Sequence, residues 1–326
     1  AASAGCASGA TSVLAGNAGK SDLGDPASVT WFAARPGSGS RDVAFGPDGA
    51  VWYCGQRDGT LTRLDPADGS LMAVPLGPGA APHGVTLGPD NAMWVTEGGQ
   101  NAIARVDPRD SKVTLMPLPE KFSRANLNTG VFDLDGTYWF TGQNGVYGRV
   151  DPDTGKVQAW ASPGGSGPYG IAVTPAGDIW YASLAGSHLA QIDRDSGKAR
   201  QVQPPTPNQG ARRVWADSKS RLWVSEWNSG QVSMHDPADN SWRQWMLPGR
   251  RPRTYAVYVD ELDRPWLTDF GANAIVMFDP ATEQFVSYPS DQSDANVRQL
   301  NGRPGEVWGG ESGNNRIVRI RFETPT

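Results

Sequence analysis

A tryptophan recurs along the chain at nearly equal intervals, and this repeat constrains the fold more than any other feature. The intervals are 42, 45, 41, 43, 43 and 42 residues, between Trp52, Trp94, Trp139, Trp180, Trp223, Trp266 and Trp308. Periods of about 40–45 residues are typical of propeller blades, in which each repeat is one supersecondary unit. One Trp at a fixed position in every repeat is best explained by packing between neighbouring sheets, not by seven ligand contacts.

Each repeat has the same internal plan. An apolar strand such as residues 41–45 comes first, followed by a tight turn such as residues 46–49, in which Pro presets φ and Gly supplies φ > 0. The Trp strand, a third strand such as residues 102–107, a second turn and a fourth strand complete the repeat. Four short antiparallel strands make one blade. The chain is therefore predicted to be all-β, a seven-bladed β-propeller.

The last repeat, residues 291–322, has only three strands of its own. Residues 29–33, upstream of the first blade, supply the missing fourth strand, so the N-terminal strand closes the ring and removes the exposed sheet edges. The predicted domains are an Ala/Gly/Ser-rich flexible leader, residues 1–28, and the propeller, residues 29–326.

Composition argues against nucleic-acid binding and against a membrane-spanning segment. With 29 Lys and Arg against 34 Asp and Glu, the net charge is −5, and no basic stripe suggests nucleic-acid binding. No run of 18 apolar residues is present, so no transmembrane segment is expected. A length of 326 residues is normal for one closed all-β domain, which we expect to be a monomer.

The leader carries one of the two cysteines. It lacks a charged segment followed by an apolar one, so we expect an exported protein, periplasmic or secreted, whose signal peptide has been removed. The stretch before Cys6 faintly resembles a lipoprotein processing site, although the leucine expected at its start is missing, which makes Cys6 a candidate lipid anchor. Cys6 and Cys54 could instead pair, or Cys54 could be a buried free thiol.

Propeller geometry converts sequence positions into places around the central channel. The first residue of each inner strand should lie beside the axis at the channel mouth: Arg41, His83, Asn128, Tyr169, Arg212, Tyr255 and Asn296. The residue three after each Trp is expected at the same mouth: Gly55, Glu97, Gly142, Ser183, Glu226, Asp269 and Glu311. A packed core would not use these polar residues, because an unpaired buried charge is costly. The alternative is a water-filled channel lined by mutually satisfied polar groups.

Arginine and aromatic residues near the inner strands indicate an anionic ligand. Guanidinium groups bind carboxylate and phosphate in bidentate fashion, unless the nearby carboxylates occupy them. Trp227 and Phe270 hold the same loop position in neighbouring blades and could form an apolar shelf. The predicted ligand-binding residues are Arg41, Arg212, Arg253, Arg298, Asn128, Tyr169, Trp227 and Phe270. His83, with Glu97 in the same blade, is the first candidate for a base or a metal ligand.

Several segments resemble the blades of the streptogramin B lyase (virginiamycin B lyase) family. They are residues 81–90 (APHGVTLGPD), 93–97 (MWVTE), 167–171 (GPYGI), 223–228 (WVSEWN) and 269–275 (DFGANAI), and the similarity extends from about residue 29 to 322. The resemblance implies a magnesium-dependent elimination, in which a His removes a proton next to the carbonyl of an ester linkage and a cyclic depsipeptide opens. It places that chemistry on the last two blades.

The sequence departs from the family at the residues that carry this chemistry. Where the family begins its sixth blade with His, this chain has Tyr255, and Asp294-Ala295-Asn296 replaces the Glu-Pro-His of the seventh. Glu311 matches the Glu after the last Trp, and Arg41 matches a first-blade Tyr. The resemblance therefore implies Asp294 and Glu311 as ligands of Mg²⁺ or another divalent cation, and the candidate catalytic residues are His83, Tyr255 and Glu311.

Three functions follow from these observations. The first is an exported lyase-like enzyme, or a hydrolase, acting on an ester-, lactone- or carboxylate-bearing small molecule at the channel mouth, with a metal as helper. The second is a non-catalytic propeller that captures an anionic small molecule or a glycan. The third, protein binding on the mouth loops, has no specific signal in the sequence.

Overall fold

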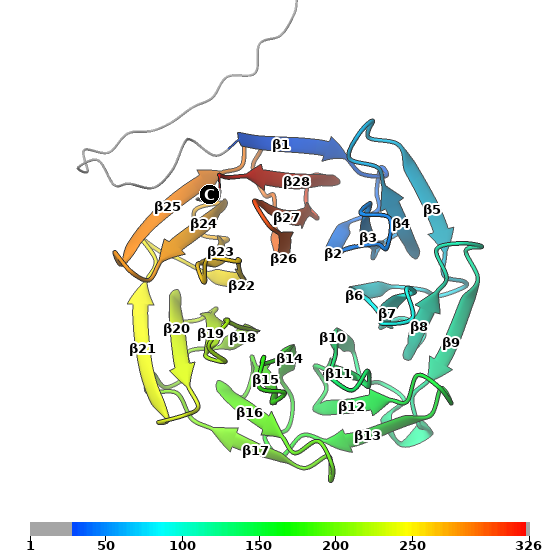
Figure 1. The fold of residues 1–326 in the computed structure, drawn as a ribbon, viewed down its shortest axis with the longest axis horizontal. Coiled ribbons are helices and arrows are strands. Elements are labelled where there is room, and N and C mark those ends of the chain that lie inside the picture. The colour runs from blue at the N-terminus through cyan, green and yellow to red at the C-terminus, as the bar shows by residue number, and fades with distance from the viewer. Residues whose placement is uncertain (1–27, 324–326) are drawn as a thin grey trace, which may run out of the picture.

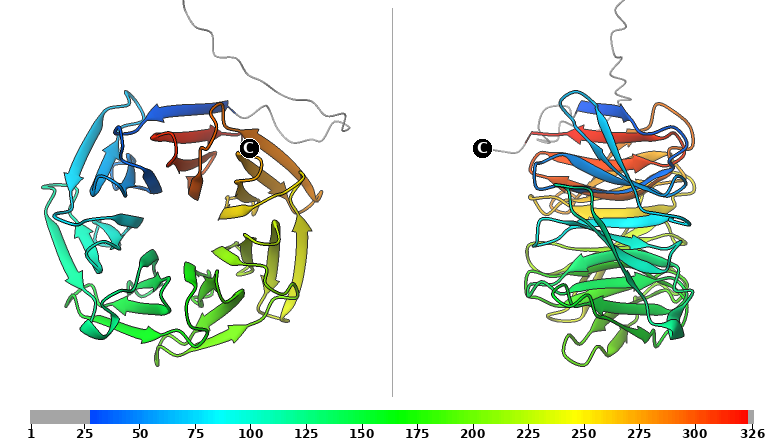
Figure 2. Two further views of the ribbon diagram at one scale, coloured as in Figure 1. Left: turned by 180° about the vertical axis from the view of Figure 1, so that it is seen from behind. Right: turned by 90° about the vertical axis from the view of Figure 1, so that its right-hand side faces the viewer.

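The computed structural model describes residues 28–323, and within them the chain forms seven four-stranded antiparallel sheets arranged in a ring (Figure 1). Figure 2 shows the ring from behind and edge-on, with the blades following one another around a central axis. The seven-bladed propeller predicted from the tryptophan repeat is confirmed. Apart from Ser28, the predicted leader lies outside the described residues.

Each blade runs from an innermost strand beside the channel to an outermost strand at the rim. The first three blades consist of β2 (Ser40–Phe45), β3 (Val51–Gly55), β4 (Thr60–Leu64) and β5 (Leu71–Pro75); β6 (Pro82–Leu87), β7 (Met93–Glu97), β8 (Ala102–Val106) and β9 (Val113–Pro117); and β10 (Leu127–Phe132), β11 (Tyr138–Gly142), β12 (Val146–Val150) and β13 (Val157–Ala161). A single 3₁₀ turn, η1 (Glu120–Phe122), precedes the third blade.

The other four blades follow the same order. They consist of β14 (Pro168–Val173), β15 (Ile179–Ser183), β16 (His188–Ile192) and β17 (Ala199–Val202); β18 (Ala211–Ala216), β19 (Leu222–Glu226), β20 (Gln231–Asp236) and β21 (Ser241–Met246); β22 (Thr254–Val259), β23 (Pro265–Asp269), β24 (Ala274–Asp279) and β25 (Gln284–Pro289); and β26 (Val297–Arg303), β27 (Glu306–Glu311), β28 (Arg316–Arg321) and β1 (Ser28–Ala33).

The N-terminal strand closes the ring as predicted. β1 pairs antiparallel with β28, from Ser28 opposite Arg321 to Ala33 opposite Arg316, and the blue strand lies outside the red one in Figure 1. The indole Nε1 of Trp31 also donates to Glu311 Oε1 at 2.9 Å, which ties β1 to the seventh blade through a side chain. The seventh sheet thereby has four strands like the others.

The repeated tryptophans pack in the core, which confirms their structural interpretation. All seven are at most 1% exposed. Trp94 of the second blade, for example, packs with Tyr138 and Phe140 of the third. In five blades the indole N–H donates to a nearby carboxylate: Trp94 to Asp90, Trp139 to Asp133, Trp223 to Asp217, Trp266 to Asp260 and Trp308 to Glu306.

A β-bulge in the innermost strand of every blade positions the candidate site. The pairing register shifts there in all seven blades, for example between Ser40 and Val43 in β2 and between Val297 and Leu300 in β26. A bulge leaves an extra residue on one strand and changes where side chains point. The register makes Arg298, not Asn296, the counterpart of Arg41. The sequence-based position for the seventh blade was therefore wrong by two residues, because β26 begins only at Val297.

Two further expectations concern Cys54 and membranes. Cys54 is a fully buried free thiol with no disulfide partner among residues 28–323, and Cys6 lies outside them. Burial raises the pKa of the Cys54 thiol well above its usual value. Over the described part of the chain, no helix is both long and apolar enough to cross a bilayer.

Candidate anion site at the channel mouth

The first residue of each bulge contributes one side chain to a ring around the channel, which we call the channel ring: Arg41, His83, Asn128, Tyr169, Arg212, Tyr255 and Arg298. Six of these seven residues were predicted at the mouth from inner-strand starts, and Arg298 was predicted as a ligand-binding residue. The structure brings them together because every blade repeats the same bulge at the same register.

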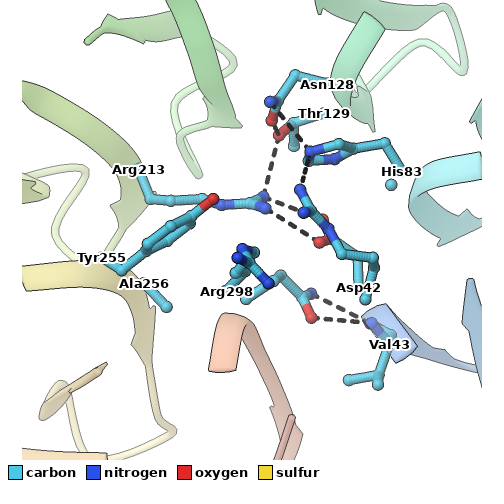
Figure 3. A network of polar contacts seen from close by, with 12 residues as sticks. Asp42, Val43, His83, Asn128, Thr129, Arg213, Tyr255, Ala256 and Arg298 are labelled. Atoms are coloured by element: carbon cyan, nitrogen blue, oxygen red, sulfur yellow. Dashed lines mark hydrogen bonds and ion pairs between the residues drawn. The ribbon is translucent and has the colours of Figure 1, made fainter. Parts of the chain in front are cut away.

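A buried ion pair spans the channel just behind this ring. The guanidinium of Arg213, from the fifth blade, donates to both oxygens of Asp42, from the first blade, at 3.0 Å each, and to Thr129 Oγ1 at 3.0 Å. Figure 3 shows Arg213 extended toward Asp42 and Thr129. The two side chains are only 5% and 3% exposed. Burial opposes the charge of Arg213, but Asp42 and the nearby phenols of Tyr169 and Tyr255 raise its pKa above the ordinary value.

His83 is held as a neutral hydrogen-bond acceptor. Its Nε2 accepts from the guanidinium of Arg41 and from Asn128 Nδ2, and Thr129 donates to Asn128 Oδ1 at 2.8 Å. Burial, together with the charges of Arg41 and Arg213, lowers the pKa of His83 well below its usual range. Glu97, its predicted partner, instead accepts from the backbone N–H groups of Ala81 and Gly99. The ring therefore places His83 at the mouth but engages its basic nitrogen.

Two tyrosines of the ring form a second polar pair. The hydroxyl groups of Tyr169 and Tyr255 hydrogen-bond to each other, and Arg212 NH2 donates to Tyr169 Oη at 3.3 Å. The guanidinium carbon of Arg212 also lies 3.5 Å from the centre of the Tyr255 ring and 4.8 Å from that of Tyr169. Both phenols are 2% exposed. Arg212 thus covers the tyrosine pair with a positive charge.

The two residues predicted to form an apolar shelf, Trp227 and Phe270, pack beside this pair. Phe270 stacks on Tyr255 with ring centroids 4.8 Å apart, and Trp227 meets Phe270 edge-on at 5.3 Å. The guanidinium carbons of Arg212 and Arg253 lie 4.5 and 4.3 Å from the Trp227 ring centre. Cation–π contacts of this kind hold arginines in place without neutralising them.

Positive charge at the mouth exceeds negative charge. Among the residues of the channel ring and their immediate followers, Arg41, Arg212, Arg213 and Arg298 face a single carboxylate, Asp42. The Nε atoms of Arg41, Arg212 and Arg213 are buried and have no hydrogen-bond partner within residues 28–323. Burial, and after it the charge of Arg41, lowers the pKa of Arg298. Unpartnered buried donors and mutually repelling guanidinium groups favour an anion at this place.

The carboxylates that follow the tryptophans do not join this mouth, contrary to the expectation from sequence. Glu226 accepts from Ser229 Oγ at 2.6 Å, and Asp269 accepts from the backbone N–H groups of Arg253 and Gly271 at 2.8 Å. Each of these side chains binds the loop of its own blade. The Asp269 carboxylate satisfies backbone N–H groups of two loops, one before the innermost strand of its blade and one after the second strand. These carboxylates therefore do not pair with the arginines at the mouth, and they do not compete with an anionic ligand for them.

The predicted metal ligands, Asp294 and Glu311, line one pocket of about 70 Å³ between the sixth and seventh blades. Glu311 is already engaged: Oε1 accepts from Trp31 and Ser290 at 2.9 Å, and Oε2 accepts from Arg316 at 2.7 Å. Asp294 is exposed to solvent. Among residues 28–323 no three His, Cys, Asp or Glu side chains converge as a metal site would require.

Because Arg316 neutralises Glu311, this donor set does not fit a resident Mg²⁺, which prefers several carboxylate, carbonyl or water oxygens. The metal-ligand assignment stays a prediction, and no chemical step proposed below depends on it.

Sequence reasoning missed Asp42 and its pairing with Arg213. Both directly follow a predicted ring residue, and the signal for them is the run of two consecutive polar residues at the start of a strand, Arg41-Asp42 and Arg212-Arg213. In a regular strand only one of two consecutive residues faces a given side. The bulge allows both to contribute to the channel.

Comparisons with known proteins agree with this architecture. The model of the virginiamycin B lyase family matches residues 7–248. Virginiamycin B lyase from Staphylococcus aureus is 19% identical, with a TM-score of 0.84 over 91% of this chain and 100% of that one. A streptogramin B lyase is 20% identical, with a TM-score of 0.83 over 91% and 98%.

A third solved structure, YCF48 bound to D1 peptide, is 15% identical, with a TM-score of 0.71 over 91% and 96% of the two chains. At these identities the solved structures show a shared fold and nothing about substrates. No curated protein sequence matches the chain.

Proposed function

This chain belongs to the virginiamycin B lyase family, and from that premise we propose that it binds an anionic small molecule at the channel mouth and performs lyase-type chemistry on it. The expected ligand carries a carboxylate, an ester or a lactone. One observation carries the proposal: four arginines from three blades face a single carboxylate inside the channel.

The electrostatics of the mouth favour such a ligand over a neutral or cationic one. Asp42 satisfies Arg213 by a bidentate pair, and in the part of the chain that the structure describes Arg41, Arg212 and Arg298 have no carboxylate partner. Arg298 is bonded only to a neutral group, the Ser312 hydroxyl. Charge-assisted bonds to a bound anion would be shielded from water here, where they are stronger than at an open surface.

The same charges suit an elimination. Removing a proton next to a carbonyl develops negative charge on the carbonyl oxygen, and fixed positive groups aimed at that oxygen lower the barrier. Arg41, Arg212 and Arg298 could supply this stabilisation. The family's histidines are matched in sequence by Tyr255 and Asn296, so the proton must go to a different residue in this chain.

The second candidate function is capture of the anion without catalysis. The observation that favours it is the state of His83, whose Nε2 is occupied by Arg41 and Asn128 and is therefore not free to accept a proton. YCF48, which shares the fold, was solved bound to a peptide. Both candidate functions require binding of an anion, but only the lyase converts the bound molecule into products.

Calorimetry with simple probes tests the anion site. We expect citrate and inorganic phosphate to bind more tightly than glycerol, which is neutral, or choline, which is cationic. Arg212→Ala should weaken citrate binding about tenfold or more, because a charge-assisted bond contributes about 1.5–3 kcal/mol. Arg109→Ala is the matched control, since Arg109 is an exposed partner of Asp107 and should leave binding unchanged.

Preferential binding of glycerol, with Arg212→Ala silent, would show that the mouth arginines serve only as structural partners. The anion-site proposal would then be lost.

The remaining expectations belong to the same proposal. We propose that the protein is exported, periplasmic or secreted, and that it works as a monomer. Cell fractionation and light scattering of the purified protein test these two points. A Cys6→Ser variant that leaves the protein in the soluble fraction, against a membrane-bound parent, would identify the lipid anchor.

A further inference from the structure

The inference concerns the residue that accepts the proton, and it rests on the anion site proposed above. We propose that Tyr169 is the base of this site, acting through its phenolate oxygen on a carbon next to the carboxylate or ester carbonyl that Arg212 holds.

In the described part of the chain, none of the other candidate bases hydrogen-bonds to Arg212, the arginine that would hold the anion. His83 Nε2 accepts from Arg41 and Asn128. Glu97 Oε1 accepts from the backbone N–H groups of Ala81, Gly99 and Gln100, and its buried Oε2 has no partner among residues 28–323. Glu311 is paired with Arg316 and lies in the pocket between blades six and seven, away from the channel ring. Tyr255, a residue predicted to be catalytic, is the hydrogen-bond partner of Tyr169.

The geometry places Tyr169 next to the guanidinium that an anion would use. Arg212 NH2 lies 3.3 Å from Tyr169 Oη, so a carboxylate bonded to Arg212 would lie in the immediate neighbourhood of that oxygen. The Tyr255 hydroxyl, which is hydrogen-bonded to Tyr169, can donate to a Tyr169 phenolate and stabilise it. A base beside a positive group that also holds the substrate is the arrangement that proton abstraction requires.

Several strands around Tyr169 bring groups that bear on its charge. β18 contributes Arg212 and Arg213, β2 contributes Arg41, and β22 contributes Tyr255, whereas β6 contributes the neutral His83, whose ring meets Tyr169 edge-on at 6.2 Å. Burial opposes ionisation of Tyr169, but Arg212, Arg213 and Arg41 outweigh it and lower the pKa of the phenol to about 8. Burial, and then Tyr169 itself, raises the pKa of Tyr255. Tyr169 is therefore the hydroxyl of the pair that ionises first, and Tyr255 keeps its proton and donates it in a hydrogen bond to Tyr169.

The substrate class that fits is a β-acyloxy acid, with its carboxylate on the arginines and its acyloxy group one carbon further on. Tyr169 phenolate takes the proton from the carbon next to the carboxylate. The electron pair of that C–H bond forms the C=C bond, and the C–O bond breaks with its pair on the departing carboxylate. Tyr169 then releases the proton to water. The step needs neither an oxidant nor a reductant.

A tyrosine titration tests the base directly, without a substrate. The near-ultraviolet absorbance of tyrosinate should rise in the native protein through a midpoint near the pKa of about 8. Tyr169→Phe should abolish that phase. Tyr147→Phe is the matched control, because Tyr147 is a buried tyrosine of the third blade that donates to Gly197 O and whose pKa burial raises, and it should leave the phase intact. A phase that survives in Tyr169→Phe overturns the proposal.

Turnover of β-acetoxybutyrate gives the second readout. Wild-type protein should release crotonate and acetate at a rate that rises with pH through about 8, because the phenolate is the active form. Tyr169→Phe should lose at least a hundredfold in rate, the usual effect of removing a general base, while its calorimetric affinity for citrate changes less than threefold. Tyr147→Phe should retain the wild-type rate.

The outcomes separate the two proposals. Wild-type protein that binds β-acetoxybutyrate but releases no crotonate overturns the role of Tyr169 and leaves the anion site standing. Protein that binds neither citrate nor β-acetoxybutyrate overturns the anion site and the base with it.

Discussion

At the scale of single residues, the buried ion pair between Asp42 and Arg213 is the contact in the channel whose loss should cost most. Their ion pair is nearly inaccessible to water, and three further arginines lie close to it. Taking two charges out of water is costly, and the bidentate geometry offsets that cost only while both partners are present. Without Asp42, Arg213 would be a buried cation surrounded by other cations.

We therefore expect Asp42→Asn to lower the free energy of unfolding by about 3–5 kcal/mol, the usual loss when one partner of a buried pair is removed. Urea unfolding followed by tryptophan fluorescence measures it. Asp135→Ala is the control, because Asp135 pairs with Arg194 at the exposed surface and should cost at most about 1 kcal/mol. A loss as small as the control's would mean that water in the channel screens the pair.

At the scale of the strand, two features recur. The bulge in the innermost strand is present in all seven blades, and the hydrogen bond from the Trp indole N–H to a nearby carboxylate is present in five. Asp217 accepts from Trp223 Nε1 and from Arg221, and Asp260 does the same for Trp266 and Arg264. In the first and fourth blades, the indole N–H groups of Trp52 and Trp180 have no hydrogen-bond partner among the described residues. The Trp position is therefore set by packing between sheets, with the hydrogen bond as an addition.

β1 is the strand whose removal should matter most. Deleting residues 1–27 should leave the melting temperature nearly unchanged if Cys6 forms no disulfide. Deleting residues 1–34 should destabilise the protein strongly, because β28 would become an open edge and Glu311 would lose its bond from Trp31. Thermal denaturation of the two truncated proteins measures the difference. A fully stable protein lacking residues 1–34 would contradict the role of β1 in closure.

The whole ring decides which residues meet. Arg213 and Asp42 are 171 positions apart in the chain, and Tyr169 and Tyr255 are 86 apart, yet each pair is in contact across the channel. Membership of the virginiamycin B lyase family explains the ring fold, whereas Tyr255 and Asn296 stand where the resemblance to that family predicts histidines.

This difference predicts negligible opening of a streptogramin B ring. The positions of both family histidines hold Tyr255 and Asn296, and the Glu311 carboxylate is neutralised by Arg316. Mass spectrometry after incubation of the antibiotic with protein and magnesium should find the ring intact. Efficient opening that is abolished by Glu311→Gln would show that the chemistry occurs in the pocket between blades six and seven and not at the arginines.

The sequence by itself determined the number of blades, the closure by β1 and most of the channel ring. These features depend on a period and on local turn chemistry, which can be read from one repeat and carried to the next. The positions of Trp52 and Trp308 in the repeat identify the first and the last blade without any structural information.

Only the tertiary structure decided how charge is distributed at the mouth. The seventh blade's register, which places Arg298 on the ring, depends on where β26 starts to pair. The pairing of Asp42 with Arg213, and the capture of Glu97, Glu226 and Asp269 by their own loops, depend on side-chain directions that a bulge reverses. Sequence spacing locates a backbone position, whereas partners across a channel are fixed only when the ring has closed.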